Sequence, residues 1–175
     1  MKKITEFKFR TDNQIYSLGL NWDDASFVDG KVAVNIVAER KNVESGRTEE
    51  LLSADVSLGI SEGEPMLTIN LKGLKLEKEF KIPVKDLFDG DSYIEQILEK
   101  IPSFLIAGDP IVGCLMRSGL SATIGQIIQC KNDTADYKWL KERMRAIGRC
   151  MKKSLPKMAT MTVVRSVRCI MKFGF

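Results

Sequence analysis

The sequence contains no histidine, and this absence removes the commonest general base at neutral pH. Histidine-dependent catalytic triads and mixed cysteine–histidine zinc sites are therefore excluded. Neither the Walker nor the dinucleotide type of glycine-rich phosphate motif occurs. Gly59–Gly63 matches the G-x-S-x-G pattern of a nucleophile elbow, but it has no histidine partner and leads into Pro65. We expect a protein that is not an enzyme, with no catalytic residues, cofactor or metal.

Cysteine pairs of the C-x-x-C type are also missing. The four cysteines are Cys114, Cys130, Cys150 and Cys169, and their spacings of 16, 20 and 19 residues match no usual metal-ligand pattern. All four stand in apolar or helical contexts, where a free cysteine behaves as a small buried hydrophobe. We therefore expect reduced thiols and a cytoplasmic location.

Long uncharged apolar runs are absent as well. No stretch reaches the roughly 18 apolar residues that span a bilayer, so no membrane-spanning helix is expected. The first ten residues carry the positive charges of a signal peptide, but no apolar run follows them. The hydrophobic content of 44 % and the charged content of 29 % are typical of a soluble globular protein.

The first half of the chain shows the period-two alternation of β-strands. Apolar residues alternate in segments such as 32–36 and 56–60, and turn signals such as Asp29–Gly30, Glu44–Gly46, Ser61–Gly63 and Gly73 separate these segments. About six strands in up-and-down order are predicted, forming an antiparallel sheet that is flat or rolled into a barrel. The apolar side of such a sheet needs a cover.

The second half supplies helical signals. Ser92–Glu95 is a capping box before a periodic run to Ile101, and Asp109–Pro110 is a second helix start. We expect the second helix to end at Gly119 and another to begin at Ser121. Residues 156–175 fit either a helix or a strand. The predicted class is α+β: a β-rich region 1–88 covered by three to five helices in a basic region 89–175, within one integrated domain.

Residues Asp133 to Leu155 predict one cationic amphipathic helix, capped by Asp133 or Thr134 and ended by Pro156. At about 100° per residue its cations gather on one face. This candidate basic interaction face consists of Lys138, Lys141, Arg145, Arg149, Lys152 and Lys153. Four interpretations remain open: a solvated surface, contact with an acidic protein surface, contact with nucleic-acid backbone, or contact with an anionic membrane.

The stretch 101–130 is unusually apolar, and Asp109 and Arg117 are its only charged residues. A buried helical pair on the sheet, a subunit interface and a membrane-inserting hairpin all fit it. The two aromatic residues at the end of the sequence suggest a docked segment. Together these segments give the candidate apolar interface: Phe104, Leu105, Ile106, Ile111, Leu115, Phe173 and Phe175.

Charge is distributed unevenly along the chain. Residues 133–175 contain eleven Lys/Arg and three Asp/Glu, a net charge of +8, which leaves −4 for residues 1–132. Opposite charges on two parts of a chain favour association within or between molecules. We expect a non-enzymatic interaction or assembly protein that binds a protein partner or its own copies as a homo-oligomer. The alternatives are nucleic-acid binding through residues 134–155, and binding of an apolar ligand or a membrane surface.

Overall fold

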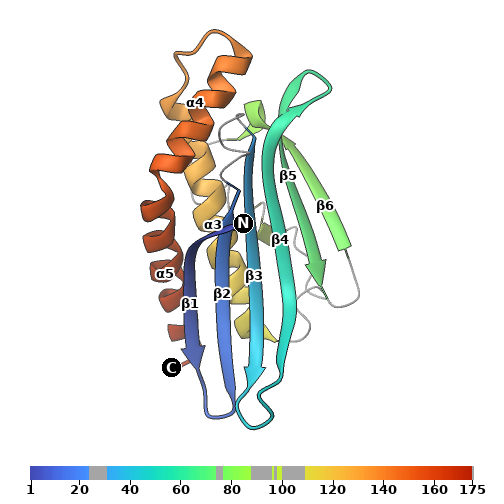
Figure 1. Cartoon of the computed structure of the whole chain (residues 1–175), viewed down its shortest axis with the longest axis vertical. Helices are drawn as coiled ribbons and strands as arrows, with labels where there is room; N and C mark the ends of the chain where they lie inside the picture. The colour runs from blue at the N-terminus through green and yellow to red at the C-terminus, as the bar shows by residue number, and fades with distance from the viewer. Residues whose placement is uncertain (24–30, 74–76, 88–95, 97, 100–108, 175) are drawn as a thin grey trace.

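The computed structural model describes residues 1–23, 31–73, 77–87, 96, 98–99 and 109–174. It shows a six-stranded antiparallel sheet followed by three C-terminal helices, which lie behind the sheet and along one of its edges (Figure 1). The predicted α+β class is confirmed, and the sheet is open rather than closed into a barrel.

The sheet is a simple meander in which each strand pairs with the next in antiparallel orientation. The strands are β1 (Lys2–Arg10), β2 (Gln14–Trp22), β3 (Val32–Asn42), β4 (Thr48–Ser61), β5 (Glu64–Gly73) and β6 (Glu77–Pro83). A short 3-10 helix, η1 (Val84–Asp86), follows β6.

Two of the predicted turns join strands. Glu62 and Gly63 connect β4 to β5 with φ angles of 54° and 77°, the positive values that a tight two-residue hairpin requires. Gly46, with φ of 69°, lies in the β3–β4 connection. The turn predicted at Asp29–Gly30 lies outside the described residues.

Alternation along the strands gives the sheet one apolar and one polar face. The apolar face is buried against the helices and includes Leu18, Leu20, Val34, Ile36, Ala54, Val56, Leu67 and Ile69. The polar face carries a row in register across β2 to β5: Asn21, Asn35, Asp55 and Asn70. Within this row the Asn35 Nδ2 group donates to Asp55 Oδ1 at 2.8 Å. The pattern is that of a sheet covered on one side.

Helix α3 (Pro110–Asp133) covers the apolar face. Its N-cap is Asp109, as predicted. The prediction that Gly119 ends this helix is wrong, since α3 continues through Gly119 and Ser121. At Gly119 the helix lies so close to the sheet that a Cβ atom would come within 2.9 Å of the Ile36 Cγ2 methyl. The glycine therefore permits a close helix–sheet approach rather than ending the helix.

Helices α4 (Leu140–Lys153) and α5 (Leu155–Met171) follow. The prediction that a helix begins at Asp133 or Thr134 is wrong: the Thr134 hydroxyl donates to the Cys130 carbonyl at 2.8 Å and ends α3. The predicted stop near Pro156 is confirmed, and Pro156 occupies the first turn of α5. For most of the segment 156–175, the helix is the correct alternative.

Helix α3 forms the centre of the core. It packs against β2, β3 and β4 on one side and against α5 on the other. Its length and its mean hydropathy of 1.4 would suit a membrane span, but 78 % of that apolar window is buried inside the protein. In this fold α3 is therefore the core helix that the sheet requires.

The expectation of free cysteines is wrong, because two disulfides pair all four. Cys114 of α3 joins Cys169 of α5, and Cys130 of α3 joins Cys150 of α4. The Cα–Cα distances of 5.9 and 5.6 Å are normal for disulfides. Each disulfide joins α3 to a helix that runs antiparallel to it (Figure 1). The paired cysteines are therefore far apart in the sequence, and their spacing alone did not predict the pairing. The expected cytoplasmic location rested on reduced thiols and loses that support.

We expect Gly119→Val to destabilise the fold by about 1–3 kcal/mol, because the added methyl groups would clash with Ile36 and Leu20. Gly19→Val is the matched control: Gly19 lies in the neighbouring strand and nothing stands within 4 Å of its Cβ position. Urea denaturation of both variants tests this. Equal stabilities would show that α3 does not approach the sheet so closely.

Removing each disulfide should cost stability according to the length of the loop it closes. Loop entropy predicts a loss of about 4 kcal/mol for the Cys114→Ala/Cys169→Ala variant and about 3 kcal/mol for Cys130→Ala/Cys150→Ala. The sequence separations are 55 and 20 residues. Urea denaturation measures the loss, and peptide mapping without reductant checks the pairing. Any other pairing would contradict the arrangement of the three helices.

Candidate functional site: the cationic helical face

The six residues of the candidate basic interaction face lie together on α4 and in the loop before it. Lys138 lies in the loop, and the other five lie on α4. All six side chains are exposed, whereas Met144, Ile147 and Met151 on the opposite side of α4 are buried. We call this group the cationic helical face: Lys138, Lys141, Arg145, Arg149, Lys152 and Lys153.

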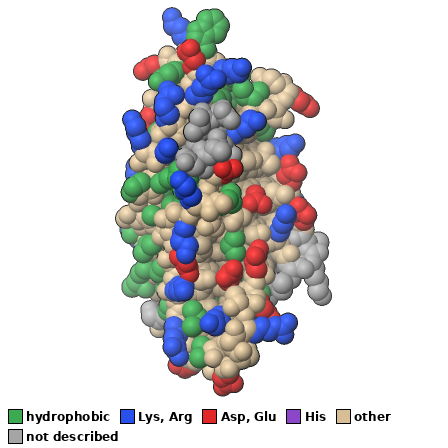
Figure 2. Space-filling model, viewed as in Figure 1, with side chains coloured by type: hydrophobic (Ala, Val, Ile, Leu, Met, Phe, Trp, Pro, Cys, Tyr) green, Lys and Arg blue, Asp and Glu red, His purple; other side chains and the backbone are tan. Residues whose placement is uncertain are grey.

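Four cations of this face form no ion pair with the acidic side chains that the structure describes. The ion pairs identified between described residues lie on the sheet, join Lys85 of η1 to Glu64, or join Arg40 to Glu49 and Asp109. None of those pairs involves Lys138, Lys141, Arg145 or Arg149. Residues 140–172 contain ten Lys/Arg and one Asp/Glu, a net charge of +9. Figure 2 shows basic side chains gathered around α4, with acidic side chains more frequent over the sheet.

Exposed apolar side chains stand at one end of the cationic helical face. Trp139 is 71 % exposed, and its neighbours Tyr137 and Leu140 are also exposed. Together they form an aromatic tip at the connection between α3 and α4, which lies at one end of the molecule (Figure 1). The indole and phenol rings provide large, rigid contact area next to positive charge.

Helix α5 carries a second exposed apolar group. Val164, Val167 and Met171 follow the i, i+3, i+7 spacing of one helix face, and Phe173 follows the helix. Of the candidate apolar interface, Phe173 is exposed, Ile111 is half-buried and Leu115 is fully buried in the core. Leu115 therefore cannot contact a partner in this structure. Phe104, Leu105, Ile106 and Phe175 lie outside the described residues.

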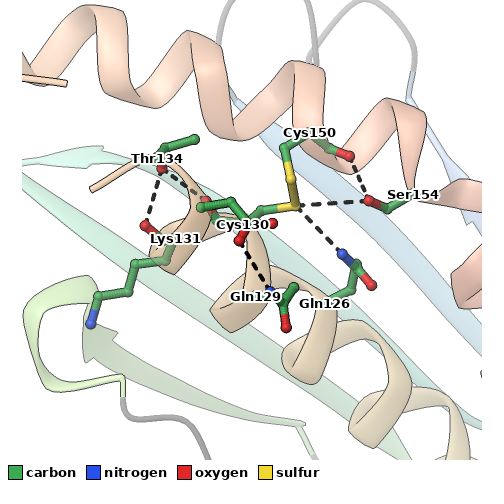
Figure 3. The surroundings of a disulfide bond; sticks show 8 residues. Gln126, Gln129, Cys130, Lys131, Thr134, Cys150 and Ser154 are labelled. Carbon is green, nitrogen blue, oxygen red and sulfur yellow. Dashed lines mark hydrogen bonds between the residues drawn. A yellow bond between two sulfur atoms is a disulfide. The ribbon is translucent and has the colours of Figure 1, made fainter. Parts of the chain in front are cut away.

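The Cys130–Cys150 disulfide connects α4 to α3 (Figure 3). The Ser154 hydroxyl donates to the Cys150 carbonyl at 2.7 Å, and the Gln126 amide lies 3.6 Å from Cys130 Sγ. Arg143 Nη2 donates to the Lys131 carbonyl at 3.1 Å, a further link between the helices. These contacts hold the backbone of α4 and thereby the spacing of its cations.

A buried polar cluster fixes the start of α3. One carboxylate oxygen of Asp109 accepts from the Ile111 amide at 3.0 Å, while the other accepts from Tyr16 Oη at 2.9 Å and Arg40 Nη1 at 3.0 Å. Asp109 therefore both caps the helix and connects it to β2 and β3. A helix N-terminus also favours this negative charge.

The same burial changes the acidity of these groups. Burial, and then the hydrogen bond and charge of Asp109, raise the pKa of Tyr16 above its ordinary value. Burial alone would lower the pKa of Arg40, but Asp109 outweighs it and raises that pKa. Near the other end of α3, burial and then the Arg143 charge lower the pKa of Lys131, whose ammonium donates to the Leu87 carbonyl. The cluster and Lys131 are structural ties between helix and sheet.

Within the described ranges, no group of three or more Cys, Asp or Glu lies close enough together to hold a metal ion. Two carboxylates of the polar sheet face accept hydrogen bonds from neighbouring amides: Asp55 from Asn35 and Glu77 from Asn70. The strongest chemical feature among the described residues is therefore positive charge on the helices.

Sequence reasoning missed a second group of cations. Arg117 of α3 and Arg165, Arg168 and Lys172 of the α5 segment line one cavity. Two signals pointed to them: Arg117 is a lone charge in an apolar stretch, and Arg165, Arg168 and Lys172 share one helical face by spacing. Only the packing of α5 on α3 brings the two signals together.

No protein-family model, curated protein or solved structure matches the chain. A functional conclusion must therefore come from the charge, exposure and geometry of the helical layer itself.

We expect Tyr16 to make the protein sensitive to alkali. A raised folded pKa means that its contribution to stability is fully present below the ordinary value of 10.0 and is lost as pH rises through the folded pKa. The free energy of unfolding should therefore fall above about pH 10, and this part of the fall should be absent in Tyr16→Phe. Urea denaturation from pH 8 to 11 measures both. If the free energy of unfolding fell equally with pH in the wild type and in Tyr16→Phe, the hydrogen bond from the Tyr16 phenol to Asp109 would not contribute to stability.

Proposed function

We propose that this protein is a non-enzymatic interaction protein that binds an acidic protein surface through the cationic helical face. One observation carries the proposal: the cations of this face are exposed. Four of them form no ion pair among the described residues, namely Lys138, Lys141, Arg145 and Arg149. Such a field attracts an acidic partner and orients it during encounter.

The exposed apolar side chains support a protein partner. Interface cores are enriched in aromatic residues, methionine and arginine, and their strongest contacts often involve Trp, Tyr and Arg. The aromatic tip supplies Trp139 and Tyr137, and α5 supplies Met171. The proposal rests on this basic region, since the described part of the apolar stretch 101–130 is mostly core.

The acidic partner surface can also belong to a second copy of the chain. Residues 1–132 carry a net charge of −4, and exposed acidic residues such as Glu50, Asp55 and Glu79 lie on the strands. A contact between the helices of one copy and the sheet of another is heterologous and builds rings or filaments. The mass of the purified protein by light scattering separates a second copy from a different partner.

Nucleic-acid backbone is the second candidate, favoured by the exposure of Trp139 beside Lys138 and Lys141. An exposed ring next to cations is a stacking platform for single-stranded bases. Among the described residues of the helical layer, exposed aromatic rings stand only at the aromatic tip and at Phe173, too few to stack a run of bases. We therefore place an acidic protein surface first.

Location enters the proposal through the disulfides. Paired cysteines persist in oxidising compartments and are rare where cellular thiols are reduced. A cytoplasmic location remains a prediction, and the pairs Cys114–Cys169 and Cys130–Cys150 count against it.

Fluorescence of Trp139 tests the proposal directly, read in a Trp22→Phe background because Trp22 and Trp139 are the two tryptophans. Poly-L-glutamate should quench or shift this fluorescence in a saturable manner, with affinity falling as salt rises. Reversal of Lys138, Lys141, Arg145 and Arg149 to glutamate should weaken binding by about a hundredfold, as summed losses of roughly 0.2–1 kcal/mol per exposed pair suggest.

The matched control reverses four exposed lysines near or on the sheet: Lys31, Lys41, Lys72 and Lys78. This control variant has the same change in net charge as the helix variant. If it binds poly-L-glutamate almost as well as the wild type, the binding surface lies on the helices. Equal loss in both variants would instead indicate non-specific attraction and contradict the proposal. Tighter binding of a single-stranded DNA oligonucleotide than of poly-L-glutamate would promote nucleic acid to first place.

A further inference from the structure

A cavity of about 480 Å³ lies between α3 and α5, separate from the cationic helical face. Its size falls within the range of about 300–1,000 Å³ that small-molecule sites occupy. The Cys114–Cys169 disulfide forms part of its wall and connects the two helices. The disulfide limits the movement of the two helices relative to each other, and a pre-formed site loses less conformational entropy when a ligand binds.

Positive charge enters this cavity from both helices. Arg117 comes from α3, and Arg165, Arg168 and Lys172 come from the α5 side. In the part of the chain that the structure describes, no Asp or Glu lines the cavity. Arg117, Arg168 and Lys172 bring three positive charges to one small space, and a bound anion would relieve the repulsion among them.

Two serine hydroxyls lie beside the cations. The Ser118 hydroxyl donates to the Cys114 carbonyl at 3.0 Å, which fixes its orientation. Ser121 is 4 % exposed and also lines the cavity. A serine hydroxyl is a hydrogen-bond donor, and a carboxylate oxygen in the cavity would accept a hydrogen bond from it.

The remaining walls are apolar. Leu98, Pro110 and Gly113 line the cavity, and Phe173 adds an aromatic ring. A site with convergent polar groups and apolar walls selects a ligand with a charged head and an apolar body. A free inorganic anion would leave the apolar walls unused.

We propose that the cavity between α3 and α5 binds an amphiphilic organic carboxylate. Its head contacts Arg117, Arg168 and Lys172 and accepts from Ser121, and its apolar body packs on Phe173 and Pro110. The site is independent of the partner surface on α4 and stands whether or not that surface binds an acidic protein.

A dansyl-labelled undecanoate is a suitable probe, because its emission reports transfer of the dansyl group from water into the cavity. One probe molecule should bind each chain saturably. Decanoate should displace it at least tenfold more effectively than decanol, which has the same chain length without the charge. Inorganic phosphate at the concentration of decanoate should not displace it.

Variants then locate the site. Arg117→Gln/Arg168→Gln/Lys172→Gln should weaken decanoate binding at least tenfold, and Phe173→Ala, at an exposed position, should weaken it several-fold. The control Lys31→Gln/Lys41→Gln/Lys72→Gln removes the same charge from exposed positions outside the cavity and outside the cationic helical face, and should change binding less than threefold. Circular dichroism confirms that each variant is folded.

Three results would overturn the proposal: no saturable binding to the folded protein, equal displacement by decanol or phosphate, or equal loss in the cavity and control variants. The tests are separable from those of the proposed function. Reversing Lys138, Lys141, Arg145 and Arg149 removes the acidic-partner surface and leaves the cavity residues in place.

Discussion

The close packing of α3 on the apolar face of the sheet is the contact on which the rest of the structure depends. Gly119 lets the helix approach Ile36 and Leu20, and buried residues along α3 complete one core with β2 to β5. Apolar burial of this extent is the dominant favourable term in folding. The Asp109 cluster fixes one end of α3, and the two disulfides attach α4 and α5 to it. Both candidate sites consist of side chains that this helix positions.

The separation of charge follows from that arrangement. The apolar sides of α4 and α5 pack inward, as buried Met144, Met151 and Met158 show, so their cations remain on the outside. The sheet turns its amides and carboxylates to the opposite side of the molecule. The result is a molecule with a basic helical layer and a mixed polar sheet surface (Figure 2). Binding of anions is the function class that this geometry favours most, at the surface of α4 and in the cavity beside α5.

Local patterns predicted the elements well, and the long-range contacts less well. Period-two alternation and the turn residues gave the strands and the Glu62–Gly63 hairpin, and Pro156 separated α4 from α5. Gly119 was misinterpreted because a helix-ending glycine and a close-packing glycine look alike in sequence. The disulfides join residues 55 and 20 positions apart, and the cavity is lined by residues from Leu98 to Phe173, so no local spacing could reveal them. The basic face on α4 was visible from periodicity alone, but the absence of ion pairs at Lys138, Lys141, Arg145 and Arg149 among the described residues was not.

The central claim is that the cationic helical face is a binding surface rather than a solvated helix side. Backbone amide chemical shifts of the isotope-labelled protein, recorded during titration with poly-L-glutamate, test it most directly. The account predicts that the chemical-shift changes concentrate on residues 137–153 and that the amide chemical shifts of β3 to β5 stay unchanged. Shifts spread over both faces of the molecule, or no shifts at low salt, would contradict it.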